Sequence, residues 1–322
     1  MKLIIQIPCF NEEYSLPVAL SELPEVIKGI DKIEVLVIDD GSTDKTKLVA
    51  EQHRVQHILS IPTNKGLANA FMSGLDFCLK ANADIIVNTD ADNQYFAGDI
   101  EKLVQPILNK EADIVVGARP ISQINHFSFI KKLLQKIGSW VVRYASQTQV
   151  QDAPSGFRAI SYEAALKLAV FNRYTYTLET IIQAGQNGMK IISIPVSVNE
   201  EIRPSRLVKN IGSYIYRSVG TILRIFMIYR PGMSFFFLGL VPFVIGFLIS
   251  LRWVVLYFIE EAARSHLPSL ILSAVLMIVG FQTWLFGLFA ELIATNRKLL
   301  EENKVRLRRL ELQRYKDIDA SK

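Results

Sequence analysis

Two acidic turns constrain the fold of this chain more than any other feature of its sequence. The first closes the segment Ile33–Ser42, in which a run of β-forming residues ends at Asp39 and Asp40. The second closes Ala83–Asp92, in which a similar run ends at Asp90-Ala91-Asp92. Both runs are short and almost continuously apolar, which is typical of strands buried on both faces of a parallel sheet. We therefore expect both turns to lie at the carboxyl edge of one sheet, where open α/β folds bind ligands.

The spacing of Asp90 and Asp92 predicts a site for a hard divalent cation, because an Asp-x-Asp turn projects two oxygen donors to one side. Such cations are usually shared between one or two carboxylates and the phosphates of a substrate. We therefore expect Mg²⁺ or Mn²⁺ at this turn, together with a nucleoside-diphosphate compound.

Strand-like runs alternate with helical patterns through the first two hundred residues. Strands are expected at Leu3–Ile7, Ile33–Ile38, His57–Ser60, Asp84–Asn88, Asp113–Val116 and Lys190–Val198. Helices are expected at Glu13–Ile27, Thr43–Gln52, Gly66–Leu79, Gly98–Leu108, Phe129–Ser146, Tyr162–Ala169 and Leu178–Asn187. This alternation predicts an α/β domain over residues 1–203, built on a doubly wound, mostly parallel sheet.

The remainder of the chain has a different composition. Residues 233–258 and 267–293 are almost wholly apolar, and each can cross a hydrocarbon core of about 30 Å as a helix. We expect a transmembrane hairpin over residues 231–295; the alternative is a buried helical hairpin of a soluble domain. Residues 204–230 place apolar side chains at helical spacing among basic ones, which favours amphipathic helices in the membrane interface. The alternative there is a solvated helix packed on the soluble domain.

The distribution of charge predicts the orientation in the membrane. Basic residues gather before the first apolar segment and again after the second, in residues 296–322, where a basic helix is expected. By the positive-inside rule, both termini should be cytoplasmic in a multi-pass protein of the inner (plasma) membrane. Met1–Ile7 is too short for a signal peptide and runs into Pro8. The charge flanks apolar segments and accompanies no nucleic-acid motif, which argues against a nucleic-acid partner.

Several motifs, taken in order, strongly resemble those of the family 2 glycosyltransferases of GT-A fold. They are Ile7–Glu12, Val37–Asp44, Asn64–Leu67 and Thr89–Asp92. The segment Asp152–Arg158 and the two apolar segments narrow the resemblance to the polyprenyl-phosphate glycosyltransferases, which include dolichyl-phosphate mannose synthases and bacterial GtrB-type enzymes. The resemblance covers the chain to about Ile293.

The resemblance implies a set of donor-binding residues. Those implied to bind the nucleotide sugar are Pro8, Phe10, Glu12, Asp39, Asp40, Lys65, Asp90, Ala91, Asp92, Gln94, Arg119 and Arg203. Asp92 is implied to be the main metal ligand, with Asp90 beside it. The residues alone leave alternatives open, since Asp40 is also a good turn residue and Arg119 could be a surface arginine after a strand.

The resemblance also implies catalytic and acceptor residues. Asp90, Asp92, Gln94 and Asp152 are implied to be catalytic, and Lys136, Arg158 and Arg206 to hold the acceptor phosphate. The chain departs from its relatives here, because Gln135-Lys136 stands where they often carry Ser-Arg. Lysine keeps the positive charge but cannot grip a phosphate with two parallel hydrogen bonds.

The expected function is the inverting transfer of a sugar from a UDP- or GDP-linked donor to a membrane polyprenyl phosphate, such as undecaprenyl phosphate. A processive synthase is disfavoured, because a Gln-x-x-Arg-Trp motif and further membrane spans are missing from the sequence. The alternative from another class is an inactive membrane-anchored nucleotide-sugar-binding or scaffold protein of the same fold.

A stripe of apolar residues, Ile293, Leu300 and Leu307, recurs every seven positions after the second apolar segment. Relatives of this branch can assemble as tetramers, and the stripe could pack between subunits of a homo-oligomer. It could instead dock on the protein's own catalytic domain.

Overall fold

The computed structural model describes residues 1–120, 139–140, 142–144, 146–170, 176–199, 220, 224, 227–260 and 267–320 of the 322-residue chain. Its contacts divide the chain into two compact units, Met1–Ser218 with Glu301–Lys322, and Val219–Leu300. The expected boundary at residue 203, most of the expected amphipathic segment 204–230 and most of the helix expected at Phe129–Ser146 lie outside the described residues.

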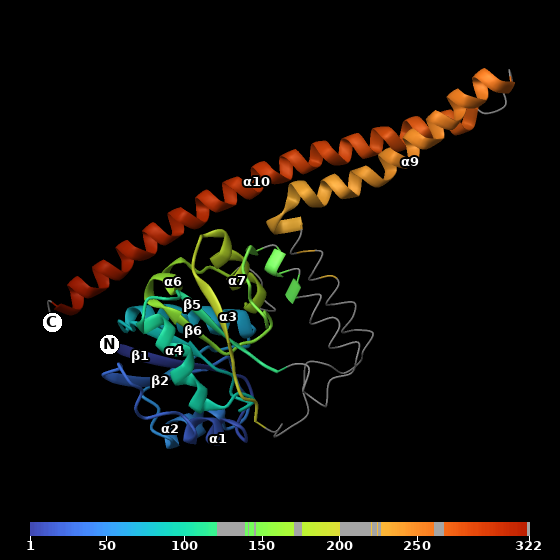
Figure 1. Ribbon diagram of the computed structural model, residues 1–322. Helices are drawn as coiled ribbons and strands as arrows, with labels where there is room; N and C mark the ends of the chain where they lie inside the picture. Colours follow the sequence, from blue (N-terminus) through green and yellow to red (C-terminus); the bar gives the residue numbers. More distant parts are fainter. Residues whose placement is uncertain are drawn as a thin grey trace. The chain divides into compact units, whose positions relative to one another are not determined.

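A seven-stranded sheet forms the centre of the first unit (Figure 1). Its strands are β1 (Lys2–Cys9), β2 (Lys32–Asp39), β3 (His57–Ser60), β4 (Ile85–Asn88), β5 (Ile114–Ala118), β6 (Arg158–Ser161) and β7 (Ile191–Pro195). They lie in the order β3-β2-β1-β4-β6-β5-β7, and all pairs are parallel except those of β6 with β4 and β5. The expected doubly wound, mostly parallel sheet is confirmed. Strand β6 was not expected, because its four residues begin with the charged Arg158 and include only two apolar ones.

Helices pack on both faces of this sheet. They are α1 (Leu16–Ser21), α2 (Thr46–Gln52), α3 (Leu67–Lys80), the short 3₁₀ helix η1 (Ala97–Asp99), α4 (Ile100–Leu108), α6 (Tyr162–Lys167) and α7 (Thr177–Gln186). Helix α4 shares one core with Leu3, Ile5 and Ile7 of β1. Helix α3 lies on the opposite face, where Gly74 approaches the side chain of Gln6. The expected helix at Glu13–Ile27 is cut short at Ser21, because the residue before Pro24 disfavours helical backbone.

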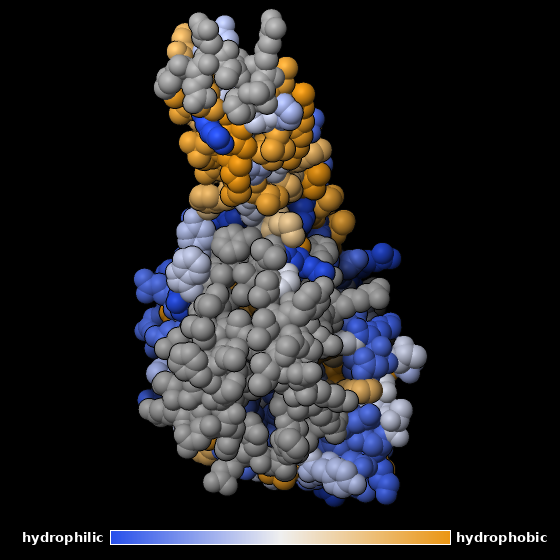
Figure 2. Space-filling view, turned by 90° about the vertical axis from the view of Figure 1, so that its right-hand side faces the viewer, coloured by the Kyte–Doolittle hydropathy of each residue, from blue (hydrophilic) through white to orange (hydrophobic). Residues whose placement is uncertain are grey.

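The second unit contains the paired helices α9 (Pro231–Glu260) and most of α10 (Leu267–Ala320). Both are long and apolar enough to cross a membrane, and each contains one of the two expected spans. Small residues let the helices touch: a Cβ on Gly239 would lie 2.6 Å from the carbonyl oxygen of Gly280, and Ser273 Oγ donates to the carbonyl of Gly246 at 2.8 Å. Close approach at small residues is a common way for membrane helices to associate. Their outer surface is apolar (Figure 2).

The last turns of α10, which belong to the first unit, pack on α3 and α6. Arg308 Nη1 donates to the carbonyl oxygens of Ala165 and Leu166, at 3.0 Å and 3.3 Å, and so caps the end of α6. Arg308 also pairs with Asp76 of α3, and Leu312 is buried. Within the first unit, the end of α10 therefore packs through Arg308 and Leu312.

The apolar stripe itself stays exposed. Its members Ile293, Leu300 and Leu307 are 70%, 66% and 61% exposed. Of these three, only Leu307 belongs to the first unit, and its exposure does not favour docking on that unit; for Ile293 and Leu300, docking on the chain's own domain stays a prediction. Packing between subunits stays a prediction.

Candidate active site

The loops that follow β1 and β2 are tied to each other at the carboxyl edge of the sheet. Backbone N–H groups of the first loop donate to side chains of the second in the pairs Asn11–Ser42 (3.0 Å), Glu12–Thr46 (2.8 Å) and Glu13–Asp44 (3.2 Å). In return, the N–H of Thr43 donates to Asn11 Oδ1 at 2.8 Å. These reciprocal hydrogen bonds fix the backbone of the loop after β1. The loop carries Phe10, whose side chain is 40% exposed.

Both aspartates of the first acidic turn accept hydrogen bonds from backbone. Asp40 accepts from the N–H groups of Lys65 and Gly66, at 2.9 Å and 2.8 Å, with one carboxylate oxygen each. Asp39 Oδ1 accepts from the N–H of Ser42 at 2.9 Å. Asp40 therefore joins the loop after β2 to the loop that opens α3. The contact of Asp40 with the nucleotide that the resemblance implies stays a prediction.

The second acidic turn follows β4 and concentrates negative charge. Burial, and then the charge of Asp92, raise the pKa of Asp90 well above its ordinary value. Asp92 Oδ1 accepts from the N–H of Gln94 at 3.1 Å, which holds the turn in shape. Two neighbouring carboxylates whose charges repel are a donor set suited to a divalent cation, which would remove this repulsion. Within the described part of the chain, no group of three or more His, Cys, Asp or Glu side chains is placed so that it could hold a metal ion.

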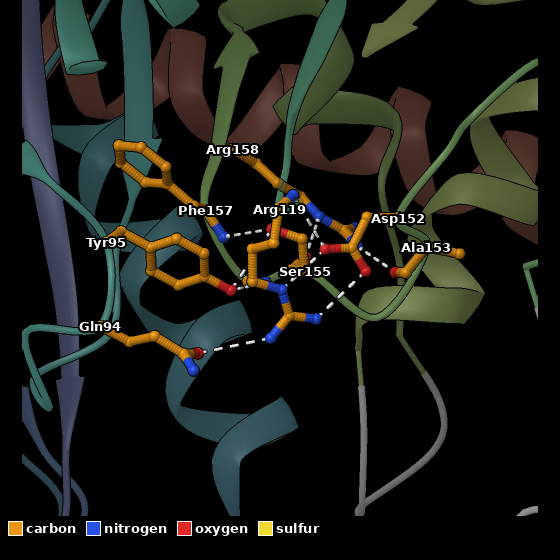
Figure 3. Close-up of polar contacts among 9 residues, drawn as sticks. Gln94, Tyr95, Arg119, Asp152, Ala153, Ser155, Phe157 and Arg158 are labelled. Atoms are coloured by element: carbon orange, nitrogen blue, oxygen red, sulfur yellow. Dashed lines mark hydrogen bonds and ion pairs between the residues drawn. The ribbon is translucent and has the colours of Figure 1, made fainter. Parts of the chain in front are cut away.

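A buried ion pair lies beside this turn. Arg119 Nε donates to Asp152 Oδ2 at 2.7 Å, and Arg119 Nη2 donates to Asp152 Oδ1 at 3.1 Å. The remaining nitrogen, Nη1, donates to Gln94 Oε1 at 3.3 Å (Figure 3). Three of the predicted site residues are thus brought into one network. The surface alternative for Arg119 is excluded, since its side chain is only 9% exposed.

Arg158 lies in the interior instead of facing an acceptor site. Its side chain is 1% exposed, and its guanidinium donates to the carbonyl oxygens of Ser155 (2.9 Å) and Ala153 (2.8 Å). It also donates to Thr180 Oγ1 at 2.6 Å. These contacts hold the turn before β6 in place (Figure 3). The placement does not favour the acceptor role expected for Arg158, because its side chain is 1% exposed and lies among buried protein groups.

The remaining predicted residues are spread over several environments. Pro8 and Ala91 are buried, whereas Lys65 is exposed. Lys136, Arg203 and Arg206 lie outside the described residues. The acceptor side of the site therefore stays a prediction from the sequence.

Four residues at the site carry contacts that sequence reasoning missed. Asn88, Tyr95, Gly156 and Tyr176 form hydrogen bonds that connect β4 with the turn before β6. One signal was visible, because Asn88 is a polar residue at the end of the continuously apolar run Ile85–Val87. The tyrosines gave no signal, since an isolated Tyr is most often an ordinary core residue.

The site thus places an acidic turn, a buried arginine and two cross-tied loops along one edge of a parallel sheet. Carboxylates suited to a divalent cation, set beside a fixed positive charge, can bind a diphosphate and stabilise charge that develops on it.

Comparisons with known proteins agree with this chemistry. A family model described as glycosyl transferase family 2 matches residues 4–175, just over half of the chain. A UDP-N-acetylglucosamine--dolichyl-phosphate N-acetylglucosaminyltransferase from Methanococcus voltae is 30% identical over 59% of this chain and 82% of its own length. An undecaprenyl-phosphate mannosyltransferase from Micrococcus luteus is 26% identical over 64% of this chain and 88% of its own.

Solved structures agree on the fold. The glucosyl-3-phosphoglycerate synthase of Mycobacterium tuberculosis, in complex with Mn²⁺, UDP-glucose and phosphoglyceric acid, superposes with a TM-score of 0.53. It is 19% identical and covers 70% of this chain and 78% of its own. At this identity the likeness concerns the fold alone, and it confirms the expected fold class.

Proposed function

The chain belongs to glycosyl transferase family 2, and from that membership we propose that it transfers a sugar from a nucleoside-diphosphate sugar to a polyprenyl phosphate. The observation that carries the proposal is the acidic turn Asp90–Asp92 beside Arg119, in a chain with two helices long enough to cross a membrane. The first feature suits a diphosphate donor, and the second suits an acceptor that stays in the bilayer.

On the donor side, Asp90 and Asp92 would hold Mg²⁺ or Mn²⁺, and Arg119 and Gln94 would face the diphosphate and sugar. A neighbouring structure of the same fold was solved with Mn²⁺ and UDP-glucose, which supports a divalent ion with a uridine nucleotide. We propose that Asp40 acts indirectly, by holding the backbone of Lys65 and Gly66 beside the nucleotide.

On the acceptor side, the proposal rests on the relatives and on the chain's own apolar helices. Two relatives are named for transfer to dolichyl phosphate and undecaprenyl phosphate. Lys136 and Arg206 remain candidates to bind the lipid phosphate, because each is a positive charge close to an apolar or amphipathic segment in the sequence. We assign Arg158 instead to holding the turn before β6.

The reaction needs little acid–base chemistry from the protein. An oxygen of the lipid phosphate forms a bond to the anomeric carbon while the bond from that carbon to the nucleoside diphosphate breaks, which inverts the anomeric centre. A phosphate monoester is mostly dianionic near neutral pH, so no strong base must activate it. When bound, the divalent ion neutralises charge on the leaving diphosphate. Asp152, paired with Arg119, orients the arginine and does not need to take a proton.

We also propose the topology that the sequence predicts, with both termini cytoplasmic. Basic residues flank the two helices, with Arg224 and Arg230 before α9 and Arg297 and Lys298 at the corresponding level of α10. Such residues are typical of cytoplasmic flanks.

The test is a donor screen with the full chain in lipid nanodiscs that contain undecaprenyl phosphate. UDP-glucose, GDP-mannose and UDP-N-acetylglucosamine are supplied one at a time with Mn²⁺ or Mg²⁺, and lipid products are identified by mass spectrometry. We expect one donor to give a lipid-linked monosaccharide, with loss of product after chelation of the metal. Nucleotide binding without transfer from any donor would instead favour the inactive binding protein.

A further inference from the structure

A chain of buried polar side chains crosses the sheet beneath the acidic turn. Gln6 Nε2 on β1 donates to Asn88 Oδ1 on β4 at 3.0 Å. Asn88 Nδ2 then donates to the carbonyl oxygen of Gly156 at 2.9 Å and to the hydroxyl of Tyr176 at 2.8 Å. The side chains of Gln6, Asn88 and Tyr176 are 0% exposed. Burying a side-chain amide in the middle of a sheet costs free energy unless its donors and acceptors are hydrogen-bonded. This series of hydrogen bonds is therefore a specific structural feature and not ordinary core packing.

This series of hydrogen bonds ends at Gly156, whose carbonyl oxygen and N–H group are both bonded to side chains. The carbonyl oxygen of Gly156 accepts from Asn88 and also from the Tyr176 hydroxyl at 3.4 Å. On the other side, the N–H of Gly156 donates to the hydroxyl of Tyr95 at 3.2 Å. Figure 3 shows the Tyr95 hydroxyl directed at the turn that contains Ser155.

Both tyrosine rings are themselves fixed by stacking. The ring of Tyr176 stacks on Phe71 with centroids 3.8 Å apart and an angle of 8° between planes. The ring of Tyr95 stacks on Phe157 at 4.9 Å. Both rings are also buried, so close packing restricts the position of each hydroxyl. Gly156 is therefore held more rigidly than a glycine in a loop usually is.

Gly156 lies next to the carboxylate of Asp90. A Cβ atom built on Gly156 would lie 2.9 Å from both Oδ1 and Oδ2 of Asp90 and 3.0 Å from the Tyr176 hydroxyl. Only glycine leaves room here for the carboxylate. The Asp90 carboxylate thus occupies the space in which the side chain of any other residue at position 156 would lie.

We propose that Asn88, Tyr95 and Tyr176 are positioning residues, which hold Gly156 against Asp90 and so fix the direction in which this carboxylate presents its oxygens to the metal–diphosphate. The inference rests on the proposed function, since it concerns the same site. A carboxylate fixed in advance loses little conformational freedom on binding, which strengthens the binding of its ligand. Groups that orient metal ligands typically change metal affinity by about 10- to 100-fold when they are removed.

The test uses Tyr176→Phe in the full chain, because this change keeps the ring on Phe71 and removes only the hydroxyl. Titration calorimetry measures the Kd of Mn²⁺ in the presence of saturating UDP, and the affinity for UDP without metal is measured separately. We expect the Kd of Mn²⁺ to rise about tenfold, with metal-free UDP binding unchanged. In turnover, the Mn²⁺ concentration for half-maximal rate should rise while kcat at saturating Mn²⁺ recovers.

A matched control separates positioning from stability. Ser146→Ala removes another buried hydroxyl of the same unit, which donates to the carbonyl oxygen of Val142 at 2.6 Å. We expect it to lower Tm without changing the Kd of Mn²⁺. Gly156→Ala is the second variant, and its methyl group should displace the Asp90 carboxylate and weaken Mn²⁺ binding more than Tyr176→Phe.

Two results would contradict the inference in different ways. If Tyr176→Phe and Gly156→Ala both bind Mn²⁺ within about twofold of wild type, the positioning role is wrong while the proposed function stands. If the wild-type chain binds UDP with no dependence on a divalent ion, the metal site itself is wrong, and the inference falls with it.

Discussion

Arg119 grips Asp152 with two parallel hydrogen bonds, from Nε to Oδ2 at 2.7 Å and from Nη2 to Oδ1 at 3.1 Å. The carboxylate is 1% exposed and the guanidinium side chain 9%. Burial fixes the orientation of both side chains in this pair. Arg119 also donates a hydrogen bond to Gln94, beside the acidic turn. The pair therefore couples the segment before β6 to the loop after β4.

The first prediction concerns this pair. Asp152→Ala leaves the charge of Arg119 buried and unpaired, which should cost roughly 3 kcal/mol. For a domain of this size, that corresponds to a fall in Tm of about 6–12 °C. Thermal unfolding in detergent measures the change. The control is Glu163→Ala, which removes the exposed pair of Glu163 with Arg309 (2.7 Å) and should change Tm little. Equal shifts for the two variants would contradict the importance of the buried pair.

The second prediction separates the two acidic turns. Asp40→Ala releases the backbone of Lys65 and Gly66 and should weaken binding of UDP whether or not a divalent ion is present. Asp92→Asn should instead weaken only the part of UDP binding that depends on the divalent ion. Calorimetry with Mn²⁺ and with a chelator distinguishes these outcomes. A purely metal-dependent loss in Asp40→Ala would move Asp40 to the metal side of the site.

The third prediction concerns stability at low pH. The carboxylate of Glu34 contacts three side chains: Lys2 Nζ, Lys32 Nζ and His57 Nε2 each lie 2.7 Å from one of its oxygens. Burial alone would raise its pKa, but the hydrogen bonds from these three side chains outweigh it and lower the pKa from 4.5 to about 2. The unfolded chain therefore binds more protons between these values, and the stabilisation by Glu34 is present above pH 4.5 and is lost as the pH falls toward 2.

The measurement compares wild type with Glu34→Gln at about pH 6 and about pH 3. The variant should have a lower Tm at the higher pH, and the gap should narrow at the lower pH. A gap that stays constant with pH would show that the carboxylate charge does not contribute.

The fourth prediction concerns the end of α10. Arg308→Ala removes the cap on the carbonyl oxygens at the end of α6 and the pair with Asp76. We expect faster amide hydrogen exchange in residues 301–320 and in α6, while β1 remains protected. Arg306→Ala, a change of the same type two positions away, is the control. Unchanged exchange in Arg308→Ala would mean that Leu312 and the other contacts suffice.

Much of the fold could be predicted because its strands are continuous apolar runs. β1 is buried from Leu3 to Cys9, and its pattern needs no tertiary information to be read. Strand β6 could not be predicted, since its first residue is Arg158, whose charge is compensated only by contacts with Ser155, Ala153 and Thr180. The resemblance implied an acceptor role for Arg158, and a motif alone does not distinguish a buried arginine from one that binds a ligand.

The sequence predicts the acidic turns of the candidate site, but not the side chains that hold the neighbouring backbone in place. Asp90 and Asp92 follow a recognisable strand, so their location could be read directly from the sequence. Asn88, Tyr95 and Tyr176 form hydrogen bonds with Gly156. This network joins segments up to 88 residues apart and depends on the antiparallel pairing of β4 with β6. No local pattern encodes such a contact.

The metal–diphosphate site is tested by comparing wild type with Asp92→Asn in the nanodisc assay, with Mn²⁺, the active donor and undecaprenyl phosphate. The change keeps the shape of the side chain and removes its charge, which weakens the binding of a hard divalent cation. We predict a lipid-linked monosaccharide from wild type and almost none from a variant of unchanged Tm. Wild-type rates of transfer by folded Asp92→Asn would contradict the metal–diphosphate site on which the account rests.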